Sequence, residues 1–273
     1  MRSLLFVPGN ELKKIQKAAA ISADAFILDW EDSVLPSHRK AARELTRNFL
    51  LQNEHLQPRA LLRINPAGSK DFELDCQALA DLPITGILLS KCQSAQEVRC
   101  LAGVLDRSDA EGRIRVHALI ESAAGILNAP QISSSCARMG SLAFGSEDYC
   151  ADLGILRTPG DIELLFARSA LVTAGRAFGL EVIDSPCLDL NDQAKLQREA
   201  QAARNLGFSG KLAIHPSQVP VLNQCFSPTE TEIETAKRIL AAFSSGTCGV
   251  LTVNGQMVDE AVLRRARQIL KMS

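Results

Sequence analysis

The sequence predicts an α/β protein, a (β/α)₈ TIM barrel with a C-terminal helical extension, and three observations lead to this prediction. Short apolar runs recur eight times within about 220 residues, segments with helical periodicity lie between most of them, and polar residues follow the runs. Eight buried strands that alternate with helices are typical of a closed parallel barrel. The apolar runs are residues 3–7, 25–30, 60–64, 86–90, 115–120, 141–145, 180–184 and 211–215.

The segment after the sixth run shows how the connecting helices are identified. Thr158-Pro159 predicts an N-cap followed by proline at the first helical position, and Gly179 predicts the helix end. An open doubly wound sheet is the alternative fold, and it normally has a glycine-rich phosphate turn after its first strand. Residues 8–14, PGNELKK, contain no GxGxxG motif, so the barrel is favoured.

Two regions are expected along the chain, the barrel in residues 1–226 and the helical extension in residues 227–273. Residues 227–230, Ser-Pro-Thr-Glu, predict a capping box that starts the first helix of the extension. Asn254-Gly255 predicts a tight turn, and an amphipathic helix is expected to follow it and to end near Lys271.

Composition narrows the classes of partner. The 273 residues are 46% apolar, enough for a sizeable core, and 30 basic residues nearly balance 31 acidic ones. We therefore expect no nucleic acid and no membrane surface as partners, and the apolar run at residues 4–7 is too short for a signal peptide. The eight cysteines are scattered without a CxxC motif, which favours free thiols and a cytoplasmic location.

Polar residues gather at the carboxyl ends of the predicted strands. In a barrel these ends face the active site, so the pattern predicts one catalytic cluster that would bind a small molecule. The residues concerned are Asn10, Asp29, Glu31, Asp32, Arg63, Asn65, Lys91, Glu121, Glu147, Asp148, Asp184 and His215.

Glu121 and Asp148 follow neighbouring strands of this predicted barrel. Adjacent strands lie about 5 Å apart, so both carboxylates could reach one ion. Two carboxylates plus waters are typical of a Mg²⁺ site that leaves positions open for a substrate. Alternatively, Glu121 is a buried carboxylate paired with Lys91 or Arg63, but the joint pattern favours the metal.

Arg63 offers a planar fork that could bind a substrate carboxylate. It could also pair with the acids of the second strand end, and both roles are compatible. These acids are read as supporting residues around the site rather than as ligands. They are Asp29, Glu31 and Asp32.

Three further residues at the strand ends have open roles. Lys91 could be a Schiff-base nucleophile, although an ion-pair partner is the favoured interpretation. Glu147 is placed with Lys91 among the supporting residues. His215 could be a general base or a hydrogen-bonded histidine at the barrel rim.

Seven ordered motifs between Arg2 and about Leu270 resemble the citrate lyase beta-subunit family, which includes malyl-CoA and citramalyl-CoA lyases, within the Mg²⁺-dependent HpcH/HpaI aldolase superfamily. The motifs are RSLLFVPGN, LDWEDSV, LLRINP, ALIESAAGILNA, GSEDYCADLG, GKLAIHPSQV and VNGQMVDEAVLRRAR. The resemblance implies a (β/α)₈ barrel that forms a homotrimer or a hexamer. It also implies Mg²⁺ ligands at Glu121 and Asp148, a substrate carboxylate on Arg63, and Asp259 reaching into a neighbouring subunit's site.

Some positions depart from the family pattern. Trp30 replaces the usual aliphatic residue between the acids of the second motif, and Ser90 stands where a proline often precedes the lysine. The sixth motif has His215, where citrate lyase subunits tend to have asparagine. These departures favour a stand-alone CoA-thioester lyase over the citryl-ACP subunit.

The expected reaction is a retro-Claisen cleavage of a 3-hydroxy-3-carboxy acyl thioester, with the substrate held by Arg63 and by Mg²⁺ on Glu121 and Asp148. The favoured substrate is (3S)-citramalyl-CoA, cleaved to pyruvate and acetyl-CoA, and Asp259 is the expected proton donor to the enolate. The alternatives are a citrate lyase beta subunit that cleaves citryl-ACP, a malyl-CoA lyase or thioesterase, a Schiff-base aldolase, and a non-catalytic subunit that binds an acyl carrier.

Overall fold

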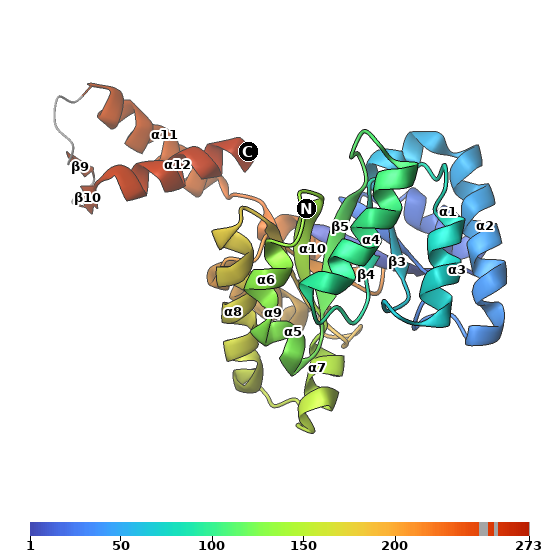
Figure 1. The fold of residues 1–273 in the computed structure, drawn as a ribbon. Coiled ribbons are helices and arrows are strands. Elements are labelled where there is room, and N and C mark those ends of the chain that lie inside the picture. Colours follow the sequence, from blue (N-terminus) through green and yellow to red (C-terminus); the bar gives the residue numbers. More distant parts are fainter. Residues whose placement is uncertain (246–250, 254–255, 273) are drawn as a thin grey trace. The chain divides into compact units, whose positions relative to one another are not determined.

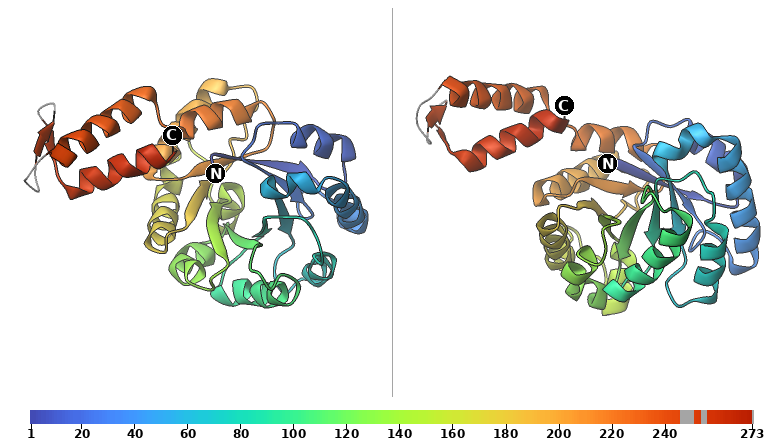
Figure 2. Two further views of the ribbon diagram at one scale, coloured as in Figure 1. Left: turned by 90° about the horizontal axis from the view of Figure 1, so that it is seen from above. Right: turned by 45° about the horizontal axis from the view of Figure 1, so that its top comes forward.

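The computed structural model describes residues 1–245, 251–253 and 256–272. Contacts within the chain divide it into two compact units, Met1–Asn223 and Gln224–Ser273. The first unit is a closed barrel of eight parallel strands in sequence order, and Leu4 of β1 pairs with Leu212 of β8 to close it (Figures 1 and 2). The predicted (β/α)₈ barrel is therefore confirmed.

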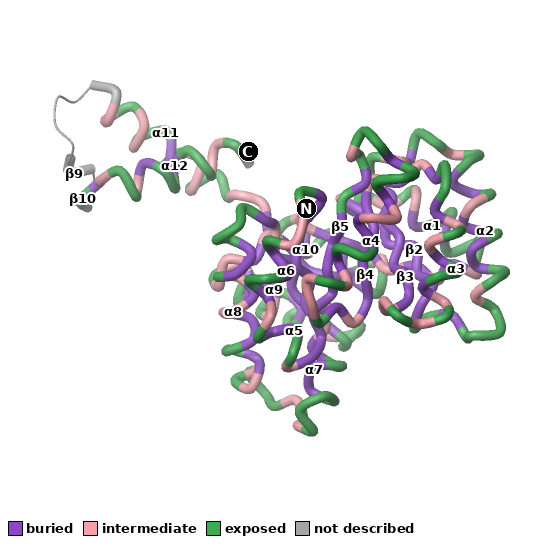
Figure 3. The backbone as a smooth tube through the Cα atoms, viewed as in Figure 1, coloured by how far each residue is buried: buried purple, intermediate pink, exposed green. Residues whose placement is uncertain are grey.

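The barrel strands are short, and all eight are built from the predicted apolar runs. Their bounds are β1 Ser3–Pro8, β2 Ala25–Asp29, β3 Ala60–Ile64, β4 Gly86–Leu89, β5 Arg115–Ile120, β6 Met139–Phe144, β7 Glu181–Asp184 and β8 Gly210–Ala213. Every residue of β2, β3, β4 and β8 is buried, because helices cover the outer face while side chains fill the interior (Figure 3).

Helices connect the strands. Their bounds are α1 Leu12–Ala19, α2 Arg39–Gln52, α3 Lys70–Ala78, α4 Ala95–Ser108, α5 Ala123–Leu127, α6 Ala129–Ser133, α7 Ser146–Leu153, α8 Leu165–Ala177, α9 Gln193–Leu206 and α10 Gln218–Phe226. Three short 3₁₀ helices, Pro36–His38, Glu54–Arg59 and Ile162–Leu164, complete the connections. Caps fix several starts, such as the reciprocal hydrogen bonds between Ser94 and Glu97 at α4.

One predicted helix start is wrong. Thr158 does not cap α8, which begins at Leu165 after a 3₁₀ turn. The backbone N–H of Thr158 instead donates to the Glu163 side chain at 2.9 Å, so this pair stabilises a loop ahead of the helix. The predicted end is confirmed, since α8 stops at Ala177 and Gly179 has a φ of 71°.

An apolar core fills the interior of the barrel. Its buried members are Leu4, Ala25, Ile27, Leu61, Leu88, Leu119, Ala143, Ile183 and Leu212. Because alternate residues of a strand face the same side, the next inward position on β2 is Asp29, on β3 Arg63 and after β5 Glu121. The sequence period therefore places charged groups directly above the core, at the carboxyl ends of the strands.

The second unit contains the α-helices α11 Glu230–Ser245 and α12 Glu260–Met272, and the antiparallel strands β9 Leu251–Val253 and β10 Gln256–Val258. The helical extension is thus confirmed. Its capping box is formed by Thr229 and Glu232, two residues later than predicted. The predicted Asn254-Gly255 turn lies outside the described residues.

The described part of the chain contains no helix that is both long and apolar enough to cross a bilayer. The seven cysteines described there are all free thiols, as the sequence predicts, and Cys248 is not among them.

Candidate functional site

A cavity of about 360 Å³ opens at the carboxyl ends of the barrel strands. Its lining is Phe6, Asp29, Asp32, Ser33, Arg63, Leu119, Glu121, Gly145, Ser146, Glu147, Asp148, Pro186, Leu212 and Ile214. Six of the residues predicted from the sequence therefore meet in one place. The apolar part of the lining, together with Ser33, Gly145 and Ser146, was not predicted, because apolar residues at strand ends look the same as core residues in a sequence.

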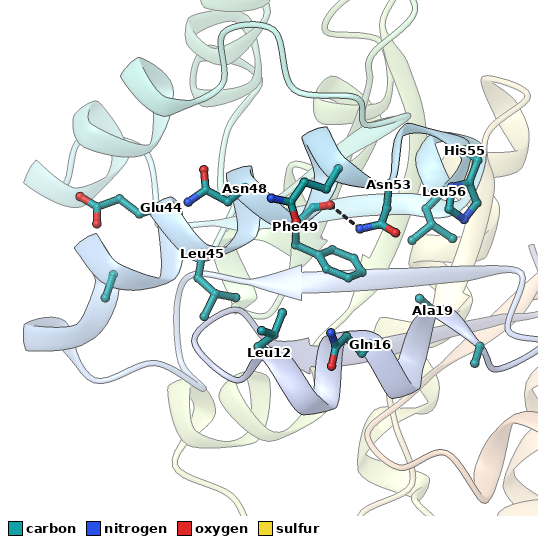
Figure 4. A pocket seen from close by; sticks show the side chains of 13 residues that line it. Leu12, Gln16, Ala19, Glu44, Leu45, Asn48, Phe49, Asn53, His55 and Leu56 are labelled. Atoms are coloured by element: carbon teal, nitrogen blue, oxygen red, sulfur yellow. Dashed lines mark hydrogen bonds between the residues drawn. The ribbon is translucent and has the colours of Figure 1, made fainter.

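A larger cavity, about 750 Å³, lies on the outside of the barrel between α1 and α2 (Figure 4). Leu12, Leu45 and Phe49 contribute its apolar surface, and Glu44 and His55 are its titratable groups. None of the residues predicted to be functional lines it. The smaller cavity, which holds the carboxylates and Arg63, is therefore the candidate active site.

Glu121 follows β5 and is buried, with only 4% of its surface exposed. The backbone N–H of Lys91 donates to Glu121 Oε1 at 2.7 Å. Burial, and then the charge of Asp148, raise the pKa of Glu121 to about 8. On its other side is Gly145, where an added Cβ would lie 2.5 Å from Glu121 Oε2. A glycine is thus required at this position for the carboxyl group to keep its place.

Asp148 lies in the first turn of α7, exposed at the cavity. Its neighbour Glu147 is paired, because Arg157 Nη1 lies 2.6 Å from Glu147 Oε1. Arg157 also donates to Ser146 Oγ at 3.0 Å, so it holds the beginning of α7 in place. Asp148 has no ion pair or hydrogen bond to any described side chain, and its charge remains available to the cavity.

Arg63 is held by acids from the end of β2. Its Nε and Nη2 donate to the two carboxylate oxygens of Asp29 at 2.7 and 2.6 Å, and its Nη1 donates to Asp32 at 3.3 Å. The guanidinium lies over the Phe6 ring, 4.7 Å from the centroid. Burial lowers the pKa of Arg63, but the hydrogen bond and charge of Asp29 outweigh it and raise the pKa above its usual value.

Lys91 belongs to the same charge cluster. Its Nζ lies 2.8 Å from Glu31 Oε1 and 3.3 Å from Asp32 Oδ1. Burial lowers the pKa of Lys91, but the hydrogen bond to Glu31 and the two nearby carboxylates raise it above its usual value. An ammonium that keeps its proton is a poor Schiff-base nucleophile, so the geometry favours the ion-pair role.

Seven residues considered from the sequence are not part of the cavity lining, namely Asn10, Trp30, Glu31, Asn65, Lys91, Asp184 and His215. His215 is exposed, and its Nδ1 accepts the backbone N–H of Ser217 at 3.2 Å. Trp30 is fully buried and donates from Nε1 to Thr46 Oγ1 at 3.1 Å, so it packs in the outer layer of the barrel.

Asp259 belongs to the second unit. Its Oδ1 accepts the backbone N–H groups of Ala261 and Val262, each at 3.0 Å, at the start of α12. Asp259 therefore acts as the N-cap of this helix, a local role that the sequence motif alone did not indicate.

The charges at the mouth do not balance. The acids Asp29, Glu31, Asp32 and Glu147 each form an ion pair with Arg63, Lys91 or Arg157. Glu121 and Asp148 form none with any described residue. No cluster of three or more His, Cys, Asp or Glu suited to a metal occurs among the described residues. Two hard carboxylates without a cation fit Mg²⁺, which retains waters and exchangeable positions.

Comparison with known proteins gives the family. The model of the HpcH/HpaI aldolase/citrate lyase family matches residues 2–216, and the model named C-C bond lyase of the TIM-barrel fold matches residues 168–273. The citrate lyase subunit beta of Leuconostoc mesenteroides subsp. cremoris is 33% identical over 100% of this chain and 93% of its own length. The mitochondrial citramalyl-CoA lyase of Mus musculus is 29% identical over 100% of this chain and 86% of its own.

A solved structure agrees with these relatives. The protein CitE of Mycobacterium tuberculosis, in complex with magnesium, acetoacetate and coenzyme A, is 34% identical with a TM-score of 0.85. The match covers 100% of this chain and 99% of the other. The chain therefore belongs to the HpcH/HpaI aldolase/citrate lyase family and is a carbon–carbon lyase of the citrate lyase beta type.

Proposed function

We propose that the protein is a Mg²⁺-dependent lyase that cleaves (3S)-citramalyl-CoA to pyruvate and acetyl-CoA. One observation carries the proposal: Glu121 and Asp148 face the same cavity without an ion-pair partner among the described residues, while the other acids at the mouth are paired. Two uncompensated carboxylates at the carboxyl end of a barrel favour a bound cation.

Glu121 and Asp148 would hold the Mg²⁺. When bound, Mg²⁺ supplies Lewis-acid stabilisation of the negative charge that develops on the oxygens of a hydroxy acid. The protein's own contribution is to fix Glu121, which the Lys91 amide and the close approach of Gly145 confine to one orientation. Burial of this carboxylate raises its pKa to about 8, so its charged form gains more from a cation than an exposed acid would.

Arg63 would bind the carboxylate of the substrate. A guanidinium has five N–H donors; three of those on Arg63 donate to Asp29 and Asp32, and its Nη1 also lies 3.1 Å from Glu31 Oε2. These contacts fix the plane of the group and leave one N–H of Nη2 for a substrate. Fixing the fork in this way lowers the entropy lost when a carboxylate binds.

The cavity lining favours a methyl group over a second carboxylate on the hydroxyl carbon of the substrate. Among the described residues, Arg63 is the single cation in the cavity lining, and Asp29 already pairs with it. The rest of the lining includes the apolar side chains of Phe6, Leu119 and Ile214. A citryl thioester has two free carboxylates, and the second would be desolvated without a cation, whereas the methyl group of citramalyl-CoA would lie against apolar atoms.

Asp259 of a neighbouring subunit would donate the proton that completes acetyl-CoA, which requires a homotrimer or a larger oligomer. The hydroxyl proton leaves as the carbon–carbon bond breaks, and the enolate carbon takes one proton from Asp259. The released hydroxyl proton would then restore Asp259, so the reaction has no net proton change. Asp259 Oδ1 accepts two amide N–H groups, so Oδ2 would be the oxygen that passes the proton to the enolate.

The test is turnover of purified protein with (3S)-citramalyl-CoA, in which pyruvate and acetyl-CoA are measured with Mg²⁺ and again with EDTA. Equal release of both products that EDTA abolishes is the expected result. Free CoA with intact citramalate would identify a thioesterase instead, and turnover that survives EDTA would contradict the metal site.

Citryl-ACP is the second candidate substrate, because the Leuconostoc relative that matches the whole chain is a citrate lyase subunit beta. Oxaloacetate release from citryl-ACP, with citramalyl-CoA and malyl-CoA inert, would overturn the argument from the apolar lining.

A further inference from the structure

Lys91 has an unusual backbone conformation. Its φ is 51°, in the left-handed region that a lysine rarely adopts. The other described non-glycine residues with positive φ are Asp81 and Asp161. Aspartate reaches this region more easily because its short side chain can bond to the local backbone, so Lys91 is the exceptional member of the three.

The strands on either side enforce this conformation. Ser90, which follows β4, donates from Oγ to the Ile64 carbonyl of β3 at 2.7 Å. Cys92 donates its N–H to the Leu119 carbonyl of β5 at 3.0 Å. The chain therefore changes partner strand within two residues, and Lys91 takes the turn between them. Strain of this kind persists where the surroundings over-determine it, and it is common at functional sites.

The strained residue has two separate contacts. Its backbone N–H donates directly to Glu121 Oε1 at 2.7 Å. Its ammonium, on a side chain that is 38% exposed, pairs with Glu31 and Asp32 after β2. The first contact depends on φ and not on the side chain, whereas the second depends on the side chain alone. The two contributions can therefore be separated by substitution.

We propose that Lys91 is a positioning residue whose left-handed backbone, rather than its ammonium group, aims Glu121 at the metal. The proposal rests on the proposed function, since it takes Glu121 as a Mg²⁺ ligand. The proposal predicts which residues position 91 tolerates. Glycine and asparagine adopt a positive φ and should keep Glu121 in place, whereas alanine and β-branched residues should not.

The test is Mg²⁺ affinity, measured by titration calorimetry on the full chain, for Lys91→Gly, Lys91→Asn, Lys91→Ala and Lys91→Val. Glycine and asparagine are expected to bind Mg²⁺ at least as tightly as wild type, because the backbone is kept and a positive charge near the ion is removed. Valine is expected to weaken binding by about 10- to 100-fold, and alanine by less. Both Lys91→Val and Lys91→Gly remove the ammonium group. Tighter Mg²⁺ binding by Lys91→Gly than by Lys91→Val is therefore a result that a purely electrostatic role of Lys91 would not give.

Asp81→Val is the matched control. Asp81 has a φ of 60°, is exposed and lies at the other end of the barrel, before β4. The Asp81→Val substitution is expected to lower the melting temperature while leaving Mg²⁺ affinity unchanged. If Asp81→Val also weakened Mg²⁺ binding, general strain and not the aim of Glu121 would be the cause.

The outcomes separate the inference from the proposed function. Wild-type protein that does not bind Mg²⁺ would overturn both. Wild-type binding with Lys91→Gly as weak as Lys91→Val would overturn the inference alone, and would assign the effect to the ammonium. If Lys91→Val does not fold, the comparison of Lys91→Gly with Lys91→Ala decides the same question.

Discussion

The mouth of the barrel has two sectors that use the same residue types in opposite ways. At the carboxyl ends of β2, β3 and β4, the acids Asp29, Glu31 and Asp32 pair with Arg63 and Lys91 at distances of 2.6 to 3.3 Å. We call this the paired sector. After β5 and at α7, the carboxylates of the second sector have no cation partner among the described residues, and we call it the unpaired sector. Its members are Glu121 and Asp148.

The difference shows where binding free energy is available. In the paired sector each carboxylate already has a cation partner, so a bound metal ion would have to displace an existing pair, while Arg63 keeps an N–H for a substrate carboxylate. In the unpaired sector Glu121 has no ion pair with any described residue; burial and the charge of Asp148 outweigh the Lys91 amide and Arg63, and raise the pKa of Glu121 to about 8. A divalent cation would relieve this cost. The paired sector is thus suited to orienting groups, and the unpaired sector to binding a metal.

The largest expected effect comes from the unpaired sector. Asp148→Asn and Glu121→Gln each remove one charged oxygen ligand at nearly constant shape, and we expect each to lower kcat by about 10³-fold because Lewis-acid stabilisation is worth several kcal/mol. Turnover of citramalyl-CoA and calorimetric Mg²⁺ binding would be measured together. The matched control is Glu147→Gln, which lies beside Asp148 and pairs with Arg157. Normal turnover and Mg²⁺ dependence in Asp148→Asn would show that the two sectors do not differ in this way.

The next effect concerns Asp259, which has both a capping role and a proposed acid role. Asp259→Asn keeps the N-cap, since asparagine caps as well as aspartate, but it removes the transferable proton. We expect a loss of kcat of about 10²-fold in Asp259→Asn with an unchanged melting temperature, and a lower melting temperature in Asp259→Ala.

Mixed oligomers test whether Asp259 acts across subunits. Asp259→Asn and Glu121→Gln are each expected to be inactive alone. Mixed oligomers should regain activity, because some sites then combine an intact Glu121 with an intact Asp259 from another subunit. Absence of any rescue would place the role of Asp259 within its own chain.

A buried histidine outside both sectors, His117 in β5, predicts how the stability of the fold depends on pH. His117 is buried, and its Nδ1 lies 2.8 Å from Ser141 Oγ. Burial, then Arg115 and the N-terminal ammonium, lower the pKa of His117 from 6.5 to about 4. The unfolded chain therefore takes up a proton below pH 6.5 that the folded chain refuses until about pH 4. Stability should fall by up to about 3 kcal/mol as the pH drops through this window.

Urea unfolding at pH 7.5 and pH 4.5 would measure this loss, with His117→Gln as the comparison. Glutamine does not titrate, so the variant should show a smaller difference between the two pH values. An equal difference in both proteins would assign the pH dependence to other groups.

Residue types and their period predict the fold and the charged residues that line the candidate site. Alternation above a barrel core brings Asp29, Arg63 and Glu121 together, and this follows from the positions of the strand ends alone. The functions of Gly145 and of the Lys91 backbone could not be predicted in this way. They depend on the distance between neighbouring strands and on the pairing of flanking residues, which no local pattern encodes.

The smallest expected effect tests the paired sector itself. Asp32 is 48% exposed and lies 3.3 Å from both Arg63 and Lys91, so its pairs are long and solvated. Such pairs contribute about 0–1 kcal/mol, and Asp32→Asn should change the kcat/KM for citramalyl-CoA by less than about fivefold. Asp29→Asn should lower the kcat/KM for citramalyl-CoA more than Asp32→Asn does, because the Asp29 side chain is 1% exposed and accepts two hydrogen bonds from Arg63. If Asp32→Asn lost as much activity as Asp148→Asn, Asp32 would contact the metal or the substrate. Asp32 would then belong to the unpaired, metal-binding sector and not to the paired sector.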